Sequence, residues 1–134
     1  MEHDALLVYG DAWGWLERNK PSFILSDVPH QLLAPLNKFV ETNKLVFINA
    51  TSPRWLTGER TAQKVVWPYR GIIAAFPDER TVCDPFMGWG PTALAALGEG
   101  RKFVGVDNKL ERVQYVKEQL ELAYPAARVH VTRL

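Results

Sequence analysis

Apolar segments of strand length alternate with segments of helical periodicity along the chain. The clearest helical pattern covers residues 109–123, where Leu110, Val113, Val116 and Leu120 form an apolar stripe opposite charged and amide side chains. Such alternation is typical of an open, mostly parallel sheet with helices on both faces, so we predict a doubly wound α/β fold. Strands are expected at residues 5–9, 22–26, 44–49, 80–83, 102–106 and 128–133.

The last of these segments, residues 128–133, alternates polar with apolar positions and predicts an edge strand with one solvent-facing side. No repeat, low-complexity run or linker interrupts the pattern. We therefore predict a single domain over residues 1–134, a length that buries roughly two thirds of the unfolded surface.

Composition narrows the class of protein only a little. Sixteen basic and fifteen acidic residues give a net charge of +1, so any nucleic-acid contact has to be local. The single cysteine, Cys83, excludes an internal disulfide and lies in an apolar strand, which favours a core position. Because the sequence has no 18-residue apolar run and no charged-then-apolar leader, we expect neither a membrane span nor secretion, and a cytoplasmic location.

The most informative stretch runs from Thr81 to Thr92, where an apolar strand reaches an acidic residue and turns through two glycines into a helix. Gly88 and Gly90 permit backbone angles that a side chain disfavours, and they let a ligand approach the main chain. Pro91 suits the first turn of a helix, whose amino end then faces the ligand. This is the local architecture of a nucleotide-type pocket.

A second strand after that helix ends at Asp107, whose carboxylate can accept hydrogen bonds from a ribose diol. By spacing alone, the glycines and Asp107 satisfy a relaxed dinucleotide fingerprint, which many folds share. Asp84 at the mouth of the loop disfavours a pyrophosphate and favours a ligand with an ammonium group, such as S-adenosylmethionine. A nicotinamide-dependent enzyme and a glycine-rich turn without a ligand are the alternatives.

Asp-Pro-Phe-x-Gly-x-Gly followed by a helix and Phe-Val-Gly-Val-Asp resembles the cofactor half of the DNA amino-methyltransferases, which methylate adenine N6 or cytosine N4. The resemblance covers residues 5–123 and implies a permuted, Rossmann-like methyltransferase fold with S-adenosylmethionine as cofactor. Trp89 stands where the family usually has a small hydroxyl residue. The cofactor-binding residues implied in this part of the chain are Asp84, Pro85, Phe86, Gly88, Gly90, Asp107 and Asn108.

Near the amino terminus, Gly10-Asp11-Ala12 follows another apolar strand. An Asp in this place can serve simply as a helix cap. In the family that the chain resembles, a Gly-Asp-Ala so placed contacts the cofactor adenine, which makes Asp11 a candidate for the adenine amino group.

The catalytic turn is expected at Asp27-Val28-Pro29-His30, after the second strand, where the family carries Asp-Pro-Pro-Tyr or a close variant. A conjugated exocyclic amine is a poor nucleophile, so acceptors have to draw on its N–H groups. The resemblance gives this role to the Asp27 carboxylate and the Val28 carbonyl, which Pro29 biases toward an extended conformation. His30 takes the place of the aromatic residue that stacks on a flipped base. An ordinary strand-ending turn is the alternative.

Along the sequence, the expected catalytic turn precedes the cofactor loop, as in the permuted class of these enzymes. A helix between them often opens with Pro-Thr-Gln-Lys-Pro, and residues 61–65, Thr-Ala-Gln-Lys-Val, match it in part. Gln63 and Lys64 are therefore candidates for the methionine carboxylate, with capping and solvation as the alternative. The resemblance also implies a central strand order that runs from residues 5–9 through 102–106, 80–83 and 22–26 to 44–49.

The family's DNA-reading domain normally lies between the strand ending near Ala50 and the helix starting near Gln63, which only about a dozen residues separate here. Such a loop is too short to read several base pairs. We therefore expect a minimal methyltransferase that acts on single- or double-stranded DNA, as a homo-oligomer or with a separate DNA-reading subunit. Of the tryptophans, Trp13 and Trp15 are expected in the core, and Trp89 near a pocket.

The sequence thus supports two hypotheses from different classes. The first is an enzyme that transfers the methyl group of S-adenosylmethionine to an exocyclic amino group of a DNA base. The alternative is a catalytically degenerate protein of the same fold that acts by binding DNA or a protein partner, for which the altered turn at Asp27 and the short reading segment argue. No metal is expected in either case.

Overall fold

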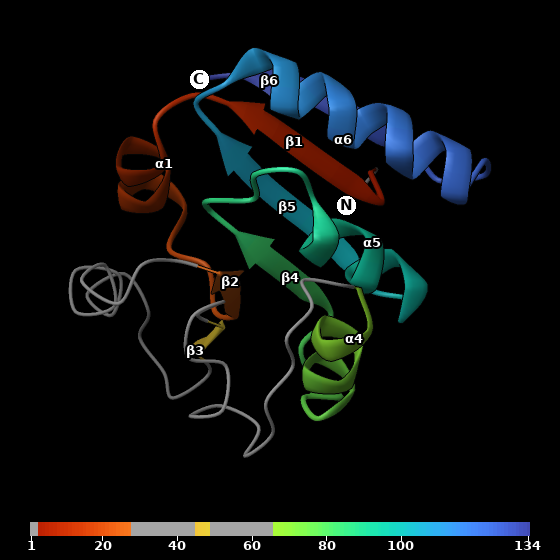
Figure 1. The fold of residues 1–134 in the computed structure, drawn as a ribbon. Coiled ribbons are helices and arrows are strands. Elements are labelled where there is room, and N and C mark those ends of the chain that lie inside the picture. The colour runs from red at the N-terminus through yellow and green to blue at the C-terminus, as the bar shows by residue number, and fades with distance from the viewer. Residues whose placement is uncertain (1–2, 28–44, 49–65) are drawn as a thin grey trace.

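The computed structural model describes residues 3–27, 45–48 and 66–134 (Figure 1). Within them, six strands form one sheet in the order β3-β2-β4-β5-β1-β6, and every pair of neighbours is parallel. This arrangement confirms the predicted fold class and the predicted order of the five central strands. The strands are β1 (Ala5–Tyr9), β2 (Ile24–Asp27), β3 (Leu45–Ile48), β4 (Thr81–Asp84), β5 (Lys102–Asp107) and β6 (Val129–Arg133).

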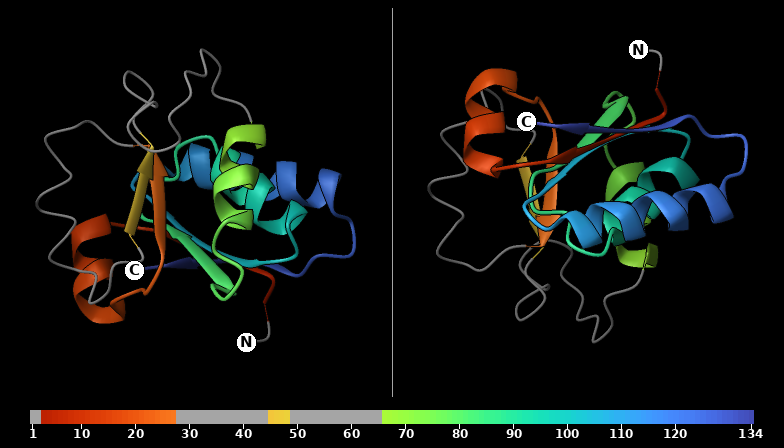
Figure 2. Two further views of the ribbon diagram at one scale, coloured as in Figure 1. Left: turned by 90° about the horizontal axis from the view of Figure 1, so that it is seen from below. Right: turned by 90° about the horizontal axis from the view of Figure 1, so that it is seen from above.

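Helices cover both faces of the sheet, as Figure 2 shows from two sides. Side chains alternate between the faces along each strand: Leu7 and Phe103 pack in one core cluster, and Val8 and Val104 pack in the other. Among the described helices, α4 (Val66–Ala74), α5 (Pro91–Gly98) and α6 (Leu110–Ala123) cover the first cluster, and α1 (Ala12–Asn19) covers the second.

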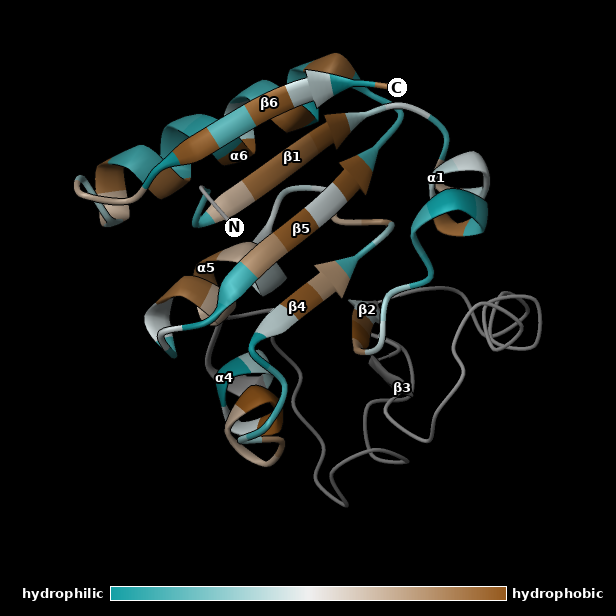
Figure 3. Cartoon of the chain, turned by 180° about the vertical axis from the view of Figure 1, so that it is seen from behind, coloured by the Kyte–Doolittle hydropathy of each residue, from teal (hydrophilic) through white to brown (hydrophobic). Residues whose placement is uncertain are grey.

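The sheet is apolar where it is covered. Figure 3 shows hydrophobic residues along β1, β4 and β5, the strands at its centre. Parallel strands buried on both faces need such near-continuous apolar runs, which explains why the strands could be located from the sequence. Cys83 lies in the second cluster and is buried, as predicted.

Helix α6 also follows the prediction, since Val113, Val116 and Leu120 are buried against the sheet. Leu110 is the exception: it begins the helix and is 43% exposed. None of the helices in the described ranges is long and apolar enough to cross a membrane.

The predicted edge strand β6 pairs with β1 in parallel and ends the sheet on that side. His130 and Arg133 are exposed, whereas the residues between them are partly buried. Asp4 fixes the start of the strand, because its Oδ2 accepts a hydrogen bond of 2.7 Å from the backbone N–H of Arg128. This contact lowers the pKa of the Asp4 carboxyl below its usual value.

The strand order reverses at β4, which has β5 on one side and β2 on the other. Four residue pairs join β4 to β5, but only Ile24 and Cys83 pair between β2 and β4. The two strands therefore lose backbone pairing toward their carboxyl ends. In open α/β sheets, ligands bind in the crevice at such a reversal.

Candidate cofactor site

The loop after β4 has the backbone geometry that its glycines predict. Gly88 has φ +55° and Gly90 has φ +86°, both in the left-handed region, and Pro91 occupies the first turn of α5. A Cβ at Gly90 would lie 2.7 Å from Cγ2 of Val116 on α6, whereas a Cβ at Gly88 would meet no atom within 4 Å. Gly90 thus allows the loop to pack on α6, and Gly88 leaves space beside the loop.

Asp107 at the end of β5 holds this loop in place. Its carboxylate is buried, and Oδ2 accepts a hydrogen bond of 3.0 Å from the backbone N–H of Gly88. Oδ1 accepts a second bond of 2.9 Å from the N–H of Lys109, and the guanidinium of Arg112 lies 3.6 Å from Oδ2. Asp107, which was predicted to bind a ribose, therefore joins the glycine loop to the start of α6.

Asp84 at the end of β4 is 2% exposed and lies behind the loop. Its Oδ1 accepts a hydrogen bond of 2.6 Å from Oγ of Ser26 on β2 and another of 3.0 Å from the N–H of Phe86. The first bond crosses the gap between β2 and β4, and the second fixes the turn into the loop. Asp84 therefore connects the two strands that flank the crevice.

A cavity of about 390 Å³ opens at the carboxyl ends of β1, β4 and β5, a volume within the range of small-molecule sites. Six residues of the predicted cofactor set line it, together with three that were not predicted. The predicted six are Asp11, Pro85, Phe86, Gly88, Asp107 and Asn108, and the additional three are Ala12, Trp13 and Arg112. Asp84 and Gly90 shape the loop without lining this cavity.

Asp11 caps a helix and also lies at the cavity. Its Oδ2 accepts a hydrogen bond of 2.9 Å from the N–H of Gly14, so the side chain caps α1. The same residue lines the cavity. Capping fixes the carboxylate at the cavity wall, where it can still accept a hydrogen bond from a ligand.

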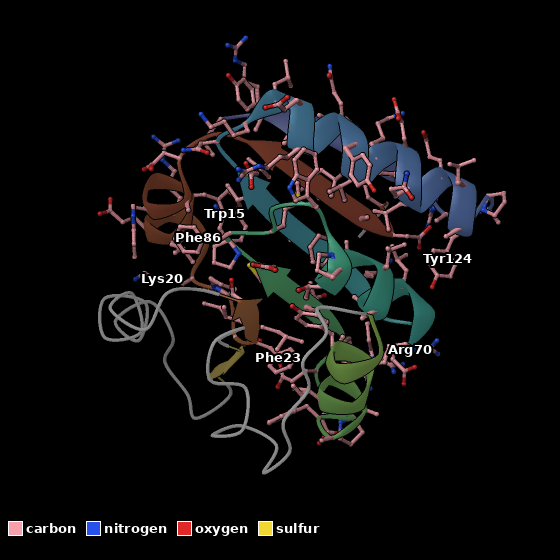
Figure 4. The ribbon with its side chains drawn as sticks, in the orientation of Figure 1. Trp15, Lys20, Phe23, Arg70, Phe86 and Tyr124 are labelled. Atoms are coloured by element: carbon pink, nitrogen blue, oxygen red, sulfur yellow. The ribbon has the colours of Figure 1, made fainter. Side chains whose placement is uncertain are left out.

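An aromatic pair forms part of the same wall. The rings of Trp13 and Phe86 meet edge to face, with centroids 5.5 Å apart and an interplanar angle of 65°. Figure 4 shows Phe86 extending from the loop after β4 toward α1. Trp15 is a core residue, as predicted, but Trp13 lines the cavity, because it belongs to the first turn of the helix that begins beside the site.

Arg112 and Trp89 lie together at the rim. The Arg112 guanidinium is 5.6 Å from the centroid of the Trp89 ring, and Trp89 meets the ring of Tyr115 edge to face at 5.1 Å. Trp89 is 55% exposed and does not line the cavity. The large ring thus lies outside the loop and supports Arg112. Sequence reasoning could have found Arg112 from its place on the first turn of α6, five residues after Asp107.

The residues predicted for the catalytic turn and the methionine carboxylate lie at or beyond the end of β2 in the sequence. Asp27 is the last residue of β2, so its backbone lies at the carboxyl edge of the sheet. Val28, Pro29, His30, Gln63 and Lys64 lie outside the described residues. Cys83 is buried beneath this edge, and burial, followed by the nearby Asp84 carboxylate, raises the pKa of its thiol well above the usual value. This is the environment of an unreactive core cysteine.

Comparison with known proteins gives consistent matches. A family model described as "DNA methylase", N6_N4_Mtase, matches residues 59–118. The type II methyltransferase M2.LlaDCHI of Lactococcus lactis subsp. cremoris is 36% identical over 70 residues, which are 52% of this chain and 26% of that protein. The type II methyltransferase M.BglI of Bacillus subtilis is 43% identical over 44 residues, 33% of this chain and 13% of that protein. The chain thus spans about a quarter or less of these curated relatives.

Solved structures show the same fold. The M1.HpyAVI–SAM complex superposes with a TM-score of 0.65 at 16% identity, covering 87% of this chain and 100% of that one. TTHA0409 of Thermus thermophilus, complexed with S-adenosyl-L-methionine, gives a TM-score of 0.66 at 14% identity, covering 96% and 99%. Residues 59–118 of this chain therefore match the family model of the DNA methylases, N6_N4_Mtase, and the chain shares the fold of these two solved structures.

Proposed function

We propose that the chain binds S-adenosylmethionine in the cavity beside Asp107 and transfers its methyl group to an exocyclic amino group of a DNA base, adenine N6 or cytosine N4. The observation that carries the proposal is the convergence of six predicted cofactor residues, from three separate strand ends, on one cavity at the reversal of the strand order. Parallel strands bring residues that are far apart in the sequence to one edge of the sheet, and in open α/β sheets ligands bind in the crevice at the reversal of the strand order.

The residues present fit a ligand of this kind. Asp107 offers carboxylate oxygens for the ribose hydroxyls, and the Trp13–Phe86 wall offers an apolar surface for a purine. Asp11 offers an acceptor for an adenine amino group. At Gly88, the open space left by the missing Cβ lets the ligand approach the main chain.

The methionine end would lie toward the start of α5. Thr92 in its first turn is 1% exposed, and its Oγ1 has no hydrogen-bond partner among the described residues. A buried hydroxyl without a partner costs about 1–3 kcal/mol, so a polar group is expected to satisfy it. Thr92 does not line the cavity, and Gln63 and Lys64 remain the candidates for the ligand carboxylate.

S-Adenosylmethionine supplies an electrophilic methyl group on a sulfonium, and this chain has to make the base amine nucleophilic. The Asp27 carboxylate and the Val28 carbonyl would accept hydrogen bonds from the amine and direct its lone pair toward the methyl carbon. His30 would stack on the base after it has left the duplex. Asp27 lies at the same edge of the sheet as the cavity, as this arrangement requires.

DNA is the proposed substrate, and we propose that sequence selection depends on a second copy of the chain or on a separate subunit. Methylation mapped by sequencing on a random duplex pool tests this point. The protein alone is expected to modify DNA with little sequence preference, or only when the partner is added. A sharp motif of five or more base pairs from the pure monomer would show that the chain itself reads DNA.

Calorimetric titration with S-adenosylmethionine, S-adenosylhomocysteine and NAD tests the cofactor, and radiolabelled methyl transfer to duplex and single-stranded DNA tests the reaction. We expect binding of the first two ligands and no binding of NAD. Asp27→Ala should abolish transfer and keep cofactor affinity within a few fold. A folded wild type that gives no heat at millimolar cofactor would refute the proposal, and equal transfer by wild type and Asp27→Ala would place the chemistry elsewhere.

A further inference from the structure

Two serines on the β2 segment join it to the β4 segment by side-chain hydrogen bonds. Ser22 Oγ donates to Oε1 of Glu79 at 3.0 Å, and Ser26 Oγ donates to Oδ1 of Asp84 at 2.6 Å. The two serines lie four residues apart, on either side of the point where Ile24 pairs with Cys83. They therefore bind opposite ends of the same pair of strands, Ser22 at the amino edge and Ser26 at the edge with the cavity.

Ser26 acts where the backbone no longer holds β2 and β4 together. The register between these strands consists of the single pair Ile24 and Cys83, so the carboxyl ends lack a ladder. Both Ser26 and Asp84 are buried, at 0% and 2% exposure, and their bond is short. A hydrogen bond to a buried carboxylate is among the stronger ones in proteins, so it can fix the separation of the two strand ends.

The Ser26–Asp84 bond joins the strand that leads to the proposed catalytic turn to the strand that leads to the cofactor loop. Ser26 directly precedes Asp27, the first residue of the proposed catalytic turn. Asp84 directly precedes the cofactor loop, and the same Oδ1 also accepts the N–H of Phe86, whose side chain lines the cavity. One carboxylate oxygen thus connects the start of the catalytic turn with the start of the cofactor loop.

From this geometry we propose that Ser26 is a positioning residue for methyl transfer, which sets the place of the Asp27 backbone at the end of β2 relative to the cavity. The proposal rests on the proposed function. Methyl transfer in line requires the acceptor and the methyl group to be held in a narrow range of distance and angle, and a displacement of about 1 Å can cost roughly a hundredfold in rate. Loss of the Ser26 hydroxyl removes the described side-chain bond that spans the crevice.

The test compares Ser26→Ala with Ser22→Ala. Each substitution removes one serine–carboxylate bond between the same two segments, and only Ser26 lies at the cavity edge. Steady-state methyl transfer is measured below the melting temperature of every variant, with kcat and the KM for S-adenosylmethionine determined separately. We expect Ser26→Ala to lower kcat at least tenfold and to raise KM no more than a few fold, whereas Ser22→Ala keeps both within twofold.

A second variant separates positioning from a loss of folding. Ser26→Thr retains the hydroxyl donor and should recover most of kcat, while Ser26→Ala, which loses a buried bond, should lose more melting temperature than Ser22→Ala, which loses a partly buried one. Equal kinetic constants for Ser26→Ala and wild type would overturn the inference, as would kinetic losses of the same size in Ser22→Ala. If wild type neither binds S-adenosylmethionine nor transfers a methyl group, the proposed function fails instead, and calorimetry on wild type distinguishes the two outcomes.

Discussion

The two glycines of the cofactor loop give a matched pair for separating backbone strain from packing. Both have φ in the left-handed region, +55° at Gly88 and +86° at Gly90, so alanine at either position costs roughly 1–2 kcal/mol of stability from backbone conformation alone. Their surroundings differ. The Cβ of Gly90→Ala would lie 2.7 and 3.0 Å from the two γ-carbons of Val116, while that of Gly88→Ala would meet nothing within 4 Å.

Overpacking a core contact adds roughly 1–3 kcal/mol, so we expect Gly90→Ala to lower the free energy of unfolding by about 2–5 kcal/mol and Gly88→Ala by about 1–2 kcal/mol. Val116→Ala deletes the two γ-carbons that clash, and it should cost about 2 kcal/mol by itself because Val116 is buried. The double variant of Gly90 and Val116 should then be more stable than the sum of the single effects by about 1–3 kcal/mol.

Urea unfolding followed by tryptophan fluorescence and circular dichroism measures these free energies. Gly88→Ala has a second expected effect, because its methyl group enters the space beside the cavity: cofactor affinity should fall although the variant is more stable than Gly90→Ala. If Gly90→Ala proved as stable as Gly88→Ala, or if Val116→Ala gave no rescue, the close packing of the loop on α6 would be wrong.

The remaining predictions concern the charges at the site and the buried thiol. Asp107→Ala should weaken S-adenosylmethionine binding by roughly 1.5–3 kcal/mol in calorimetry, and it should also destabilise the fold because the N–H groups of Gly88 and Lys109 lose their acceptor. Arg112→Gln should instead strengthen binding by up to about fivefold. A carboxylate has about four acceptor positions and the two backbone N–H groups use two, so the half-exposed guanidinium of Arg112, 3.6 Å from Oδ2, competes with a ribose diol for the others. Weaker binding by Arg112→Gln would mean that the arginine contacts the ligand directly. Cys83 should resist thiol reagents at pH 8 in the native state. Because burial raises the pKa of its thiol, the free energy of unfolding of wild type relative to Cys83→Ala should be unchanged below about pH 9 and should decline above it. Rapid native modification would contradict the buried position.

Much of the fold could be predicted because its strands are buried on both faces. Continuous apolar runs marked β1, β4 and β5, and the resemblance to permuted methyltransferases supplied the strand order that the structure confirms. The exposure of Leu110 was not predictable from periodicity, because a helical stripe shows which residues share a side but not how far along the helix that side is covered.

The site was predictable where backbone conformation restricts the choice of residue, and less so where side chains meet through space. Left-handed φ values at Gly88 and Gly90 require glycine or strain, so the loop is visible in the sequence. The contacts of Trp13 with Phe86 and of Arg112 with Trp89 join segments whose relative placement only the folded sheet determines. The bond from Ser26 to Asp84 was hidden for the same reason, since 58 positions separate its partners.

The direction of β6 has a practical consequence for labelling the protein. Because β6 runs parallel to β1, it ends at the same edge as the cavity, and the side chain of Leu134 lies close to Gly10 and Gly14 beside Asp11. A fluorophore attached at position 134 would therefore lie beside the cavity, while one attached at position 3 would lie at the opposite edge of the sheet. The two labelling positions thus give a near and a distant reporter for titrations with S-adenosylmethionine.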